Sequence, residues 1–478
     1  MTTALLALPT TAPFSGDKIF TWKDVAAHNT LSDAWVAIDG VVYDVTDMAE
    51  SHPGGSEIIA IIAGREASEL FRSYHPFAAQ LKHAQLWLEK EMHGVRRLGV
   101  LDADAMEFPA FLSDEEAGGF FKEACEVVDE YFKRTGLDSK NPAGGLKRMV
   151  PVALAAATTF SIMNGWLDLA WPLRVLAAIV FGVCQVLPLL HVMHDSSHLA
   201  IGHHQGWWKT LGRASLDFFA GGSMLSWQHQ HTIGHHIHTN FFQADPDVPD
   251  HGEVRRVTKP QKWASVYRWQ WLYLPLAYSL LTMKVRVDDI VYIWWQRMNG
   301  PLRVNYFDSA WLRIVASKGF WVSWRLLFPL LVLQVPASTF WTLFLIGELA
   351  SGFWLAWNFQ VSHISQETVF PSDLKSLDDG RSPLSWAETQ VITGVDYAPG
   401  NALVTFFAGA LNYQITHHLF PCVSQYHYPA ITPLIKAVAQ KHGLPWRVEP
   451  TYAAAWKAHV NHLYDMGQQG TYVPLELE

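Results

Sequence analysis

The chain has 478 residues, half of them hydrophobic, so it is too long for one ordinary soluble core and apolar enough for a membrane protein. A formal net charge of -9 argues against a nucleic-acid partner, which requires a basic surface. Cys125, Cys184 and Cys422 lack CxxC spacing, so we predict neither a disulfide framework nor a thiolate metal site. At the N-terminus, Pro9 interrupts an apolar run that no basic residue precedes, so we predict no cleaved signal peptide.

Residues 16–97 are predicted to form a small α+β domain. Two β-rich runs, 35–38 and 41–45, flank the dipeptide Asp39-Gly40, which supplies the positive φ angles of a type I′ hairpin turn. His52 then opens the motif His-Pro-Gly-Gly, in which proline and glycine allow a tight turn beside a histidine. A second histidine, His75, follows 23 residues later.

This pair of histidines resembles that of cytochrome b5. The resemblance implies that His52 and His75 are the axial ligands of a haem b. Two imidazoles on opposite faces of a porphyrin leave no open position on the iron, which suits an electron carrier and not an oxygenase. The alternative is two surface histidines around a loop, and the neighbouring hairpin and glycine pair argue against it.

Residues 98–147 are predicted to link this domain to the rest of the chain by one amphipathic helix. Residues 113–116, Ser-Asp-Glu-Glu, fit a capping box, and Gly136 supplies a stop. Apolar residues recur between them at helical spacing, whereas the polar face is acidic. We interpret that face as solvated, with partner binding as the alternative.

Four membrane spans are predicted in a domain covering residues 148–460, which precedes a tail at 461–478. A bilayer core needs about 20 apolar residues in a helix. Two pairs of runs approach or meet this length: 149–166 with 172–193, and 321–335 with 338–358. A weaker run, 269–283, is expected to lie in the interface, with five or six spans as the alternative.

Basic residues predict the orientation of these spans. The turns near Gly165 and Pro336 contain no Lys or Arg, whereas the segment 194–320 contains many. Both termini, the haem domain and the active site are therefore expected to face the cytosol. The membrane is expected to be that of the endoplasmic reticulum.

Three histidine clusters flank the apolar segments. Their sequences are HDSSH at 194–198, HTIGHH at 231–236 and QITHH at 414–418. On a helix, histidines at these spacings share one side, so their rings can converge. A site rich in imidazole and free of carboxylate suits iron, copper, nickel or zinc, and excludes magnesium and calcium. Seven or more nitrogens predict two metals, and an attached haem domain that supplies single electrons favours iron.

The three clusters resemble the histidine boxes of the membrane fatty acyl desaturases, over nearly the whole chain. The resemblance implies an all-α integral membrane domain with four transmembrane helices, a cytosolic cap and a di-iron centre. The implied ligands, which are also the implied catalytic residues, are His194, His198, His231, His235, His236, His417 and His418. His363 matches a further ligand although it lies outside a multi-histidine box, and Gln414 could contribute its side-chain oxygen or act through water.

Other polar residues near the boxes are expected to have supporting roles. Asp195, Asp245 and Asp247 could orient ligand imidazoles by accepting a hydrogen bond from the ring nitrogen that does not bind metal. The remaining histidines fall outside the box spacing. They are expected to pack in the core, to face solvent or to contact a metal ligand without binding the metal. They are His191, His203, His204, His229, His238 and His251.

The chain has glutamine at position 414, where many members of the superfamily have histidine, and it has an N-terminal haem domain. In these two features it resembles the front-end desaturases, which insert a double bond between an existing one and the carboxyl end. This implies O2-dependent dehydrogenation of a long-chain polyunsaturated acyl-CoA or phospholipid in the lipid bilayer. Electrons would come from NADH through NADH-cytochrome b5 reductase. Segments such as 20–30 and 423–429 are similar to Δ5 enzymes that act on C20 acyl chains. The alternatives are Δ4, Δ6 or Δ8 desaturation, a sphingolipid desaturase, a fatty acyl hydroxylase, and a haem protein whose boxes are only structural.

Overall fold

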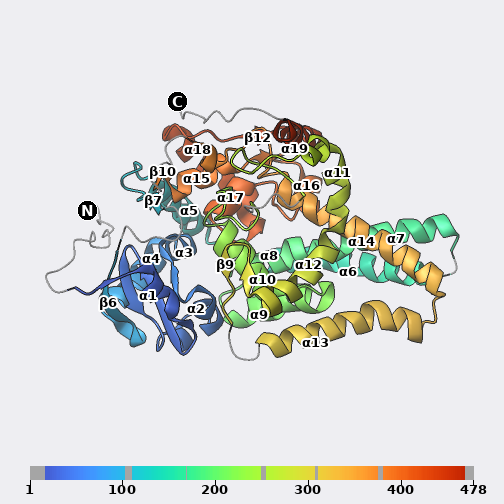
Figure 1. Ribbon diagram of the computed structural model, residues 1–478, viewed down its shortest axis with the longest axis horizontal. Coiled ribbons are helices and arrows are strands. Elements are labelled where there is room, and N and C mark those ends of the chain that lie inside the picture. Colours follow the sequence, from blue (N-terminus) through green and yellow to red (C-terminus); the bar gives the residue numbers. More distant parts are fainter. Residues whose placement is uncertain are drawn as a thin grey trace.

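The computed structural model describes residues 17–102, 110–167, 169–248, 254–306, 310–374 and 381–468. The sequence at 1–16, on which the signal-peptide prediction depends, lies outside the described residues, as does His251. Figure 1 shows a small sheet-containing domain at one end, long helices at the other, and a helical cap between them. The haem-type domain and the cap therefore lie at the same end of the helix bundle.

The N-terminal domain is built on a mixed sheet with the strand order β1-β6-β4-β3-β2, and β5 pairs with β3. Asp39 and Gly40 have φ angles of 50° and 72°, which confirms the predicted hairpin turn between β3 and β4. The strands are β1 Ile19–Phe20, β2 Asn29–Thr30, β3 Asp33–Ile38, β4 Val41–Asp44, β5 Arg65–Glu66 and β6 Arg96–Leu101. The helices are α1 Trp22–Ala27, α2 Ser56–Ile62, α3 Ser68–Tyr74 and α4 Ala78–Glu89.

The amphipathic helix α5, Phe120–Thr135, begins later than the capping box predicts. Ser113 and Glu116 do form the reciprocal hydrogen bonds of a capping box, but a turn follows them instead of a helix. The carboxylate of Asp114 instead accepts hydrogen bonds from the backbone N–H groups of Phe121 and Lys122 at the start of α5. At the other end, Gly136 has a φ of 65°, so the predicted stop is confirmed.

The apolar face of α5 packs into the cap, against helix α18, Tyr428–Lys441. Part of the acidic face is paired as well, since both carboxylate oxygens of Glu123 accept hydrogen bonds from Lys441, at 2.7 and 2.8 Å. Both side chains remain partly exposed, so Glu123 is in contact with solvent and also with a partner in the cap.

The structure has four helices long and apolar enough to span a membrane among its described residues, as predicted. They are Ala143–Met163 (α6), Trp171–Ser197 (α7 Trp171–Pro188, η4 Leu189–Met193 and α8 His194–Ser197), Ala310–Val332 (α13 Ala310–Val322 and η10 Ser323–Val332) and Ala337–Gln360 (α14). The prediction that the third span begins at 321 is wrong by 11 residues. The helix accommodates Arg313 and Lys318 because each faces a carboxylate, Asp217 at 3.4 Å and Asp289 at 2.7 Å.

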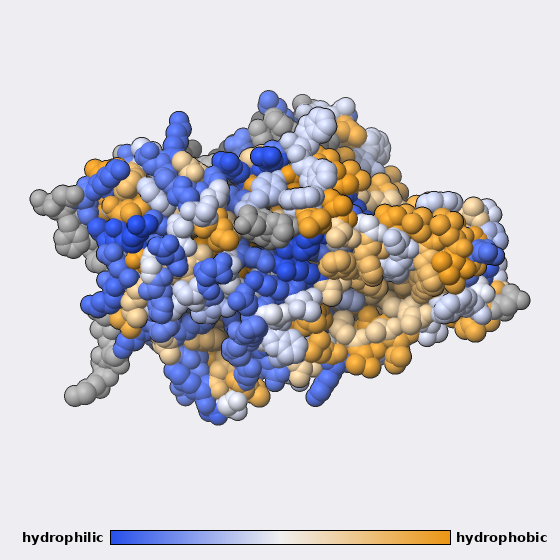
Figure 2. Space-filling model, turned by 90° about the horizontal axis from the view of Figure 1, so that it is seen from below, coloured by the Kyte–Doolittle hydropathy of each residue, from blue (hydrophilic) through white to orange (hydrophobic). Residues whose placement is uncertain are grey.

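Figure 2 shows apolar residues gathered over the end of the molecule formed by the long helices, and polar residues over the opposite end. The run predicted to lie in the interface forms short helices, α11 Gln270–Ala277, η8 Tyr278–Leu280 and α12 Leu281–Ile290, which pack on α14. Trp269, Leu272 and Leu276 are exposed on this segment. Exposed aromatic and aliphatic side chains on a short helix fit a position at a membrane surface.

The cap is assembled from short helices and pairs of short strands. Its helices include α9 Gln205–Arg213, η5 Ala214–Ala220, α10 Met224–Trp227, η6 Gln228–His235, α15 Trp386–Thr393, α16 Ala402–Phe407, α17 Gln414–Leu419 and α19 Tyr452–Gly467. The strand pairs are β7 Ala110–Leu112 with β10 Arg381–Ser385, β8 Met298–Asn299 with β9 Leu302–Arg303, and β11 Asp396–Tyr397 with β12 Val448–Glu449. The pairing of β7 with β10 joins the segment before α5 to the cap.

Candidate metal centre and haem site

The first histidine box lies at the end of the second span, and the second box follows after the three intervening helices α9, η5 and α10. His194 lies on α8 and His198 caps its C-terminal end. The second box lies on η6, which is a π-helix and not the α-helix that the spacing suggests. In this box the backbone N–H of His236 donates to the carbonyl of His231 at 3.0 Å. An i to i+5 bond places these two residues one above the other, and such turns are frequent at functional sites.

The third box reaches the same place from the other end of the chain. Gln414, His417 and His418 lie on α17, and all three are buried. His363 follows the end of α14 and is also buried. The structure thus brings together every candidate metal-binding residue that the sequence predicts.

The Nε2 atoms of the histidines all turn toward one another. Nε2–Nε2 distances are 3.1 Å between His194 and His231, 3.3 Å between His231 and His236, and 3.0 Å between His236 and His417. A second set is centred on His363, whose Nε2 lies 3.3 Å from that of His235 and 3.1 Å from that of His418. Two unprotonated nitrogens repel at such distances unless a cation lies between them.

The donor atoms separate into adjoining groups, each within 4.8 Å. One group contains His194, His198, His231 and His417, and another contains His235, His363 and His418. The third, made of His236, His417 and His418, shares members with both. The first two groups, which the third connects, have the capacity to hold two metal ions side by side.

Several Nδ1 atoms of these rings are bound from outside the cluster. The Nδ1–H of His235 donates to Asp245 at 3.0 Å, and that of His418 donates to the side-chain oxygen of Gln390 at 2.7 Å. His363 Nδ1–H donates to the carbonyl of Thr393 at 3.2 Å. Such partners fix the tautomer that leaves Nε2 free to bind a metal.

Burial sets the protonation of the cluster. It holds the pKa of His198, His231 and His236 well below the ordinary value of 6.5, and neighbouring imidazoles lower it further. For His235, burial is the largest single influence and disfavours the charged form, but the charge and hydrogen bond of Asp245 and the charge of Asp247 together outweigh it and raise the pKa. Because protons are disfavoured at most of these rings, metal cations are the natural occupants of the space between them.

The donor chemistry fits iron. Eight buried imidazoles converge and carboxylates stay at the periphery, which suits a borderline transition metal. Within the described part of the chain, His198 Nε2 has no hydrogen-bond partner, as expected of an atom reserved for a metal. The side-chain nitrogen of Gln414 faces His363 Nε2 at 2.7 Å, and a half-turn of the amide would present the oxygen instead.

The histidines of the N-terminal domain are held by local contacts. The backbone N–H of Gly54 donates to His52 Nδ1 at 3.2 Å, and His75 Nδ1–H donates to the carbonyl of Phe71 at 2.7 Å. The His75 bond leaves its Nε2 unprotonated and available as an axial ligand, whereas the neutral His52 ring, which accepts at Nδ1, carries its proton on Nε2 and would move it to Nδ1 on binding a haem iron. Burial lowers the pKa of His52 and of His75 to about 4, so both rings are neutral and able to bind a haem iron.

Some contacts at the cluster were not predicted from the sequence. Gln390 and Thr393 belong to α15, which carries no histidine, and Tyr74 and Tyr428 place their hydroxyls 2.8 and 3.3 Å from Nδ1 of His198 and His417. A capping box at Ser385 and Glu388 was the available signal for α15, but it does not indicate which side chains face the cluster.

Asp245 has the predicted orienting role, whereas Asp195 does not contact an imidazole among the described residues. It instead accepts hydrogen bonds from the hydroxyl of Ser424 at 2.8 Å and from the backbone N–H of Gln425. Asp247 lies 3.7 Å from His235 Nδ1 and accepts a hydrogen bond from Gln230 at 2.8 Å.

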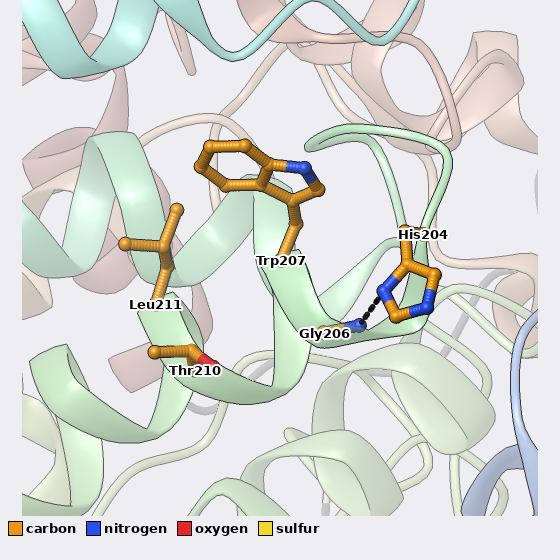
Figure 3. A pocket seen from close by; sticks show the side chains of 5 residues that line it. All are labelled: His204, Gly206, Trp207, Thr210 and Leu211. Carbon is orange, nitrogen blue, oxygen red and sulfur yellow. Dashed lines mark hydrogen bonds between the residues drawn. The ribbon is translucent and has the colours of Figure 1, made fainter.

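Four histidines outside the boxes form hydrogen bonds with groups that do not belong to the cluster. His229 donates to the carbonyl of Leu225 and accepts from the backbone N–H of Asn305. His191 contacts the carbonyl of Phe406, and His203 contacts Asp138. The ring of His204 accepts a hydrogen bond from the N–H of Gly206 and caps α9 (Figure 3). His204 also lines a surface hollow with a volume of about 370 Å³.

A two-histidine domain docked beside a polyhistidine cluster, at one end of four apolar helices, defines a membrane-bound metal oxidoreductase. Comparison with known families supports this class. A family model described as fatty acid desaturase matches residues 169–450, and one described as cytochrome b5-like heme/steroid binding domain matches residues 21–102.

Relatives are similar along nearly the whole chain. The Delta(5) fatty acid desaturase A of Dictyostelium discoideum is 36% identical, over 95% of each chain. The acyl-lipid (8-3)-desaturase of Mortierella alpina is also 36% identical, over 94% of this chain and 97% of its own length. The acyl-lipid (7-3)-desaturase of Rebecca salina is 27% identical, over 94% of this chain. The chain therefore belongs to the fatty acid desaturase family and carries a cytochrome b5-like domain in the same polypeptide.

Proposed function

We propose that this enzyme is a front-end desaturase that inserts a cis double bond at the Δ5 position of a C20 polyunsaturated acyl chain. The relatives at 36% identity, which are named for Delta(5) and (8-3) desaturation, support this choice. The more distant (7-3) relative makes Δ4 activity the first alternative, ahead of Δ6 and Δ8.

The convergence of the Nε2 atoms is the observation that carries the metal assignment. We assign His194, His198, His231, His235, His236, His363, His417 and His418 as ligands of two irons, with Gln414 beside His363 as a further candidate. When bound, the irons would supply the oxidising power, with O2, that removes hydrogen from an unactivated methylene pair. The protein's own contribution is to orient the imidazoles of the cluster from Asp245, Gln390 and Thr393. Burial also lowers the pKa of His363 and His418 and so keeps these two rings unprotonated.

The haem domain completes the electron supply. His52 and His75 would hold a haem b that accepts electrons originating in NADH through a cytochrome b5 reductase and passes them to the metal centre. Covalent attachment replaces a diffusional encounter by a high effective concentration of the donor. Basic residues are in excess at the end of the bundle that carries both sites, which supports a cytosolic location for the two sites. We assign the membrane itself to the endoplasmic reticulum.

Expression in yeast tests this function. Cells expressing the chain are fed C18, C20 and C22 polyunsaturated acids, and their fatty acids are analysed by gas chromatography. We expect a new Δ5 double bond in C20 substrates, and lipid-class analysis distinguishes phospholipid from acyl-CoA as the carrier. Hydroxylated products would replace this proposal by a hydroxylase. Products at another position would correct the regiospecificity alone.

A further inference from the structure

The surface between the haem domain and the cap is a built interface. Glu57 on α2 lies at its centre, paired with Arg213, with Lys209 at 3.6 Å and with Arg313 at 3.7 Å. Trp208 on α9 donates its indole N–H to the carbonyl of Gly54 at 3.1 Å. Charged and apolar contacts together hold the domain in one orientation.

Apolar packing and backbone contacts extend this interface. Ile61 of the haem domain is buried in a cluster with residues of the cap and of α13, among them Leu225 and Ile233. The side-chain amide of Asn305 donates to the carbonyls of Ala60 and Ala63, at 3.1 and 2.7 Å. These contacts involve the helix that follows His52, so they fix the side of the domain that carries the haem ligands.

Tyr74 joins the two sites across this interface. It is the last residue of α3 and immediately precedes His75 in the chain. Its hydroxyl lies 2.8 Å from Nδ1 of His198, and the two rings lie with their centroids 6.4 Å apart. In the tautomer that leaves His198 Nε2 facing the cluster, Nδ1–H donates to the hydroxyl oxygen of Tyr74.

We propose that Tyr74 is the coupling residue between the two redox sites: it orients His198 and carries electrons along the path His75, Tyr74, His198. The path consists of covalent bonds within and between adjacent residues and one hydrogen bond. In each transfer one electron passes from the reduced haem to the oxidised metal centre. The haem loses this electron and the metal centre gains it. The tyrosine keeps its proton and is unchanged. This inference rests on the proposed function, because it requires both metal sites.

A comparison of two tyrosines separates this role from simple support of a ligand. Tyr428 also places its hydroxyl near Nδ1 of a box histidine, His417, at 3.3 Å. It belongs to α18 in the cap and has no covalent link to a haem ligand. Tyr74→Phe and Tyr428→Phe therefore remove the same atom from equivalent positions, and only the first interrupts the path.

Electron transfer is measured in the full-length enzyme loaded with haem and iron. Under anaerobic conditions a flash-activated deazaflavin reduces the haem while the iron centre is oxidised, and the decay of the reduced-haem absorbance gives the transfer rate. We expect Tyr74→Phe to slow this decay by about tenfold or more, because the path loses its one hydrogen bond in addition to a partner of a metal ligand. Tyr428→Phe loses only a partner of a metal ligand, so it should slow the decay clearly less than Tyr74→Phe does.

Three further measurements complete the test. The haem spectrum and the iron content of Tyr74→Phe should equal those of the wild type, and direct chemical reduction of the iron centre should restore a normal single-turnover yield. An unchanged decay rate, equal slowing in both variants, or a loss of iron from Tyr74→Phe would each overturn the proposed path. A wild-type enzyme that binds no metal besides haem would overturn the proposed function as well.

Discussion

The two candidate metal sites are held in opposite ways. In the haem domain, Nδ1 of His52 and of His75 bonds to backbone groups no more than four residues away. In the cap, the rings of His235, His363 and His418 are oriented by groups between 10 and 30 residues away in the chain. A locally held site can form as soon as its own domain folds. The cluster requires the whole cap to be assembled first.

The largest effect on activity should come from removing one ligand of the histidine cluster while the haem site is left intact. His418→Ala should reduce product formation at least about 100-fold and lower the iron content, because His418 lies in two of the donor groups. The haem absorbance should stay at the wild-type level. Metal analysis and the optical spectrum of purified protein measure the two losses separately.

The reciprocal variant provides the control for that experiment. His52→Ala should abolish haem binding and reductase-driven turnover while non-haem iron is retained. Loss of both metals in either variant would show that the sites depend on each other and would remove the distinction.

A smaller effect is expected when an orienting partner is removed. Asp245→Asn should weaken iron binding by roughly 10- to 100-fold, because the amide attracts the His235 ring less strongly than the carboxylate does. Iron retention during titration with a chelator measures this change. No single side-chain substitution can do the same to His75, whose partner is the carbonyl of Phe71. Iron affinity equal to that of the wild type would contradict the orienting role.

Acid should destabilise the cap through His459, which is buried on α19. Its Nδ1–H donates to the carbonyl of Ile364 at 2.6 Å, and burial lowers its pKa from 6.5 to about 3. Above pH 6.5 both the folded and unfolded chains hold this ring neutral, so its stabilising contribution is complete. As the pH falls from 6.5 toward 3, only the unfolded chain takes up the proton, and about 2 kcal/mol is lost by pH 5.

Melting temperatures in detergent at pH 7 and pH 5 measure this effect. We expect His459→Gln, which cannot take up the proton, to lose less stability between the two pH values than the wild type does. The same loss in both proteins would assign the acid sensitivity to other groups.

The smallest effect is expected at an exposed ion pair on the helix that joins the two regions. Lys133 lies 2.8 Å from Asp129 on α5, and its side chain is 62% exposed. Lys133→Ala should change the free energy of unfolding by no more than about 0.5 kcal/mol and leave both metal contents unchanged. A larger change in a denaturant titration would show that this surface matters to the docking of the haem domain.

The elements that the sequence predicts well are those specified by nearby residues. The hairpin at Asp39-Gly40 and the stop at Gly136 depend on local backbone preferences, and both are confirmed. The histidine boxes are visible because several ligands recur at helical spacing. The boundaries proposed for the domains stay predictions.

Other features depend on contacts between distant segments and leave no local pattern. The third span could not be traced back to Ala310 because its charges are unfavourable until the partners Asp217 and Asp289 are known. Tyr74 and Gln390 reach the cluster only after the cap has folded. His363 was visible only through resemblance, because a single histidine after a span has no spacing to recognise.

The second glycine of the HPGG motif has a left-handed backbone and faces the cap. Gly55 has a φ of 91°, which disfavours other residues, and the side-chain amide of Gln205 on α9 lies directly against it. The motif usually associated with haem binding is therefore also a point of contact between domains. A chimaera that takes its haem domain from another desaturase should work best when α9 is exchanged together with it.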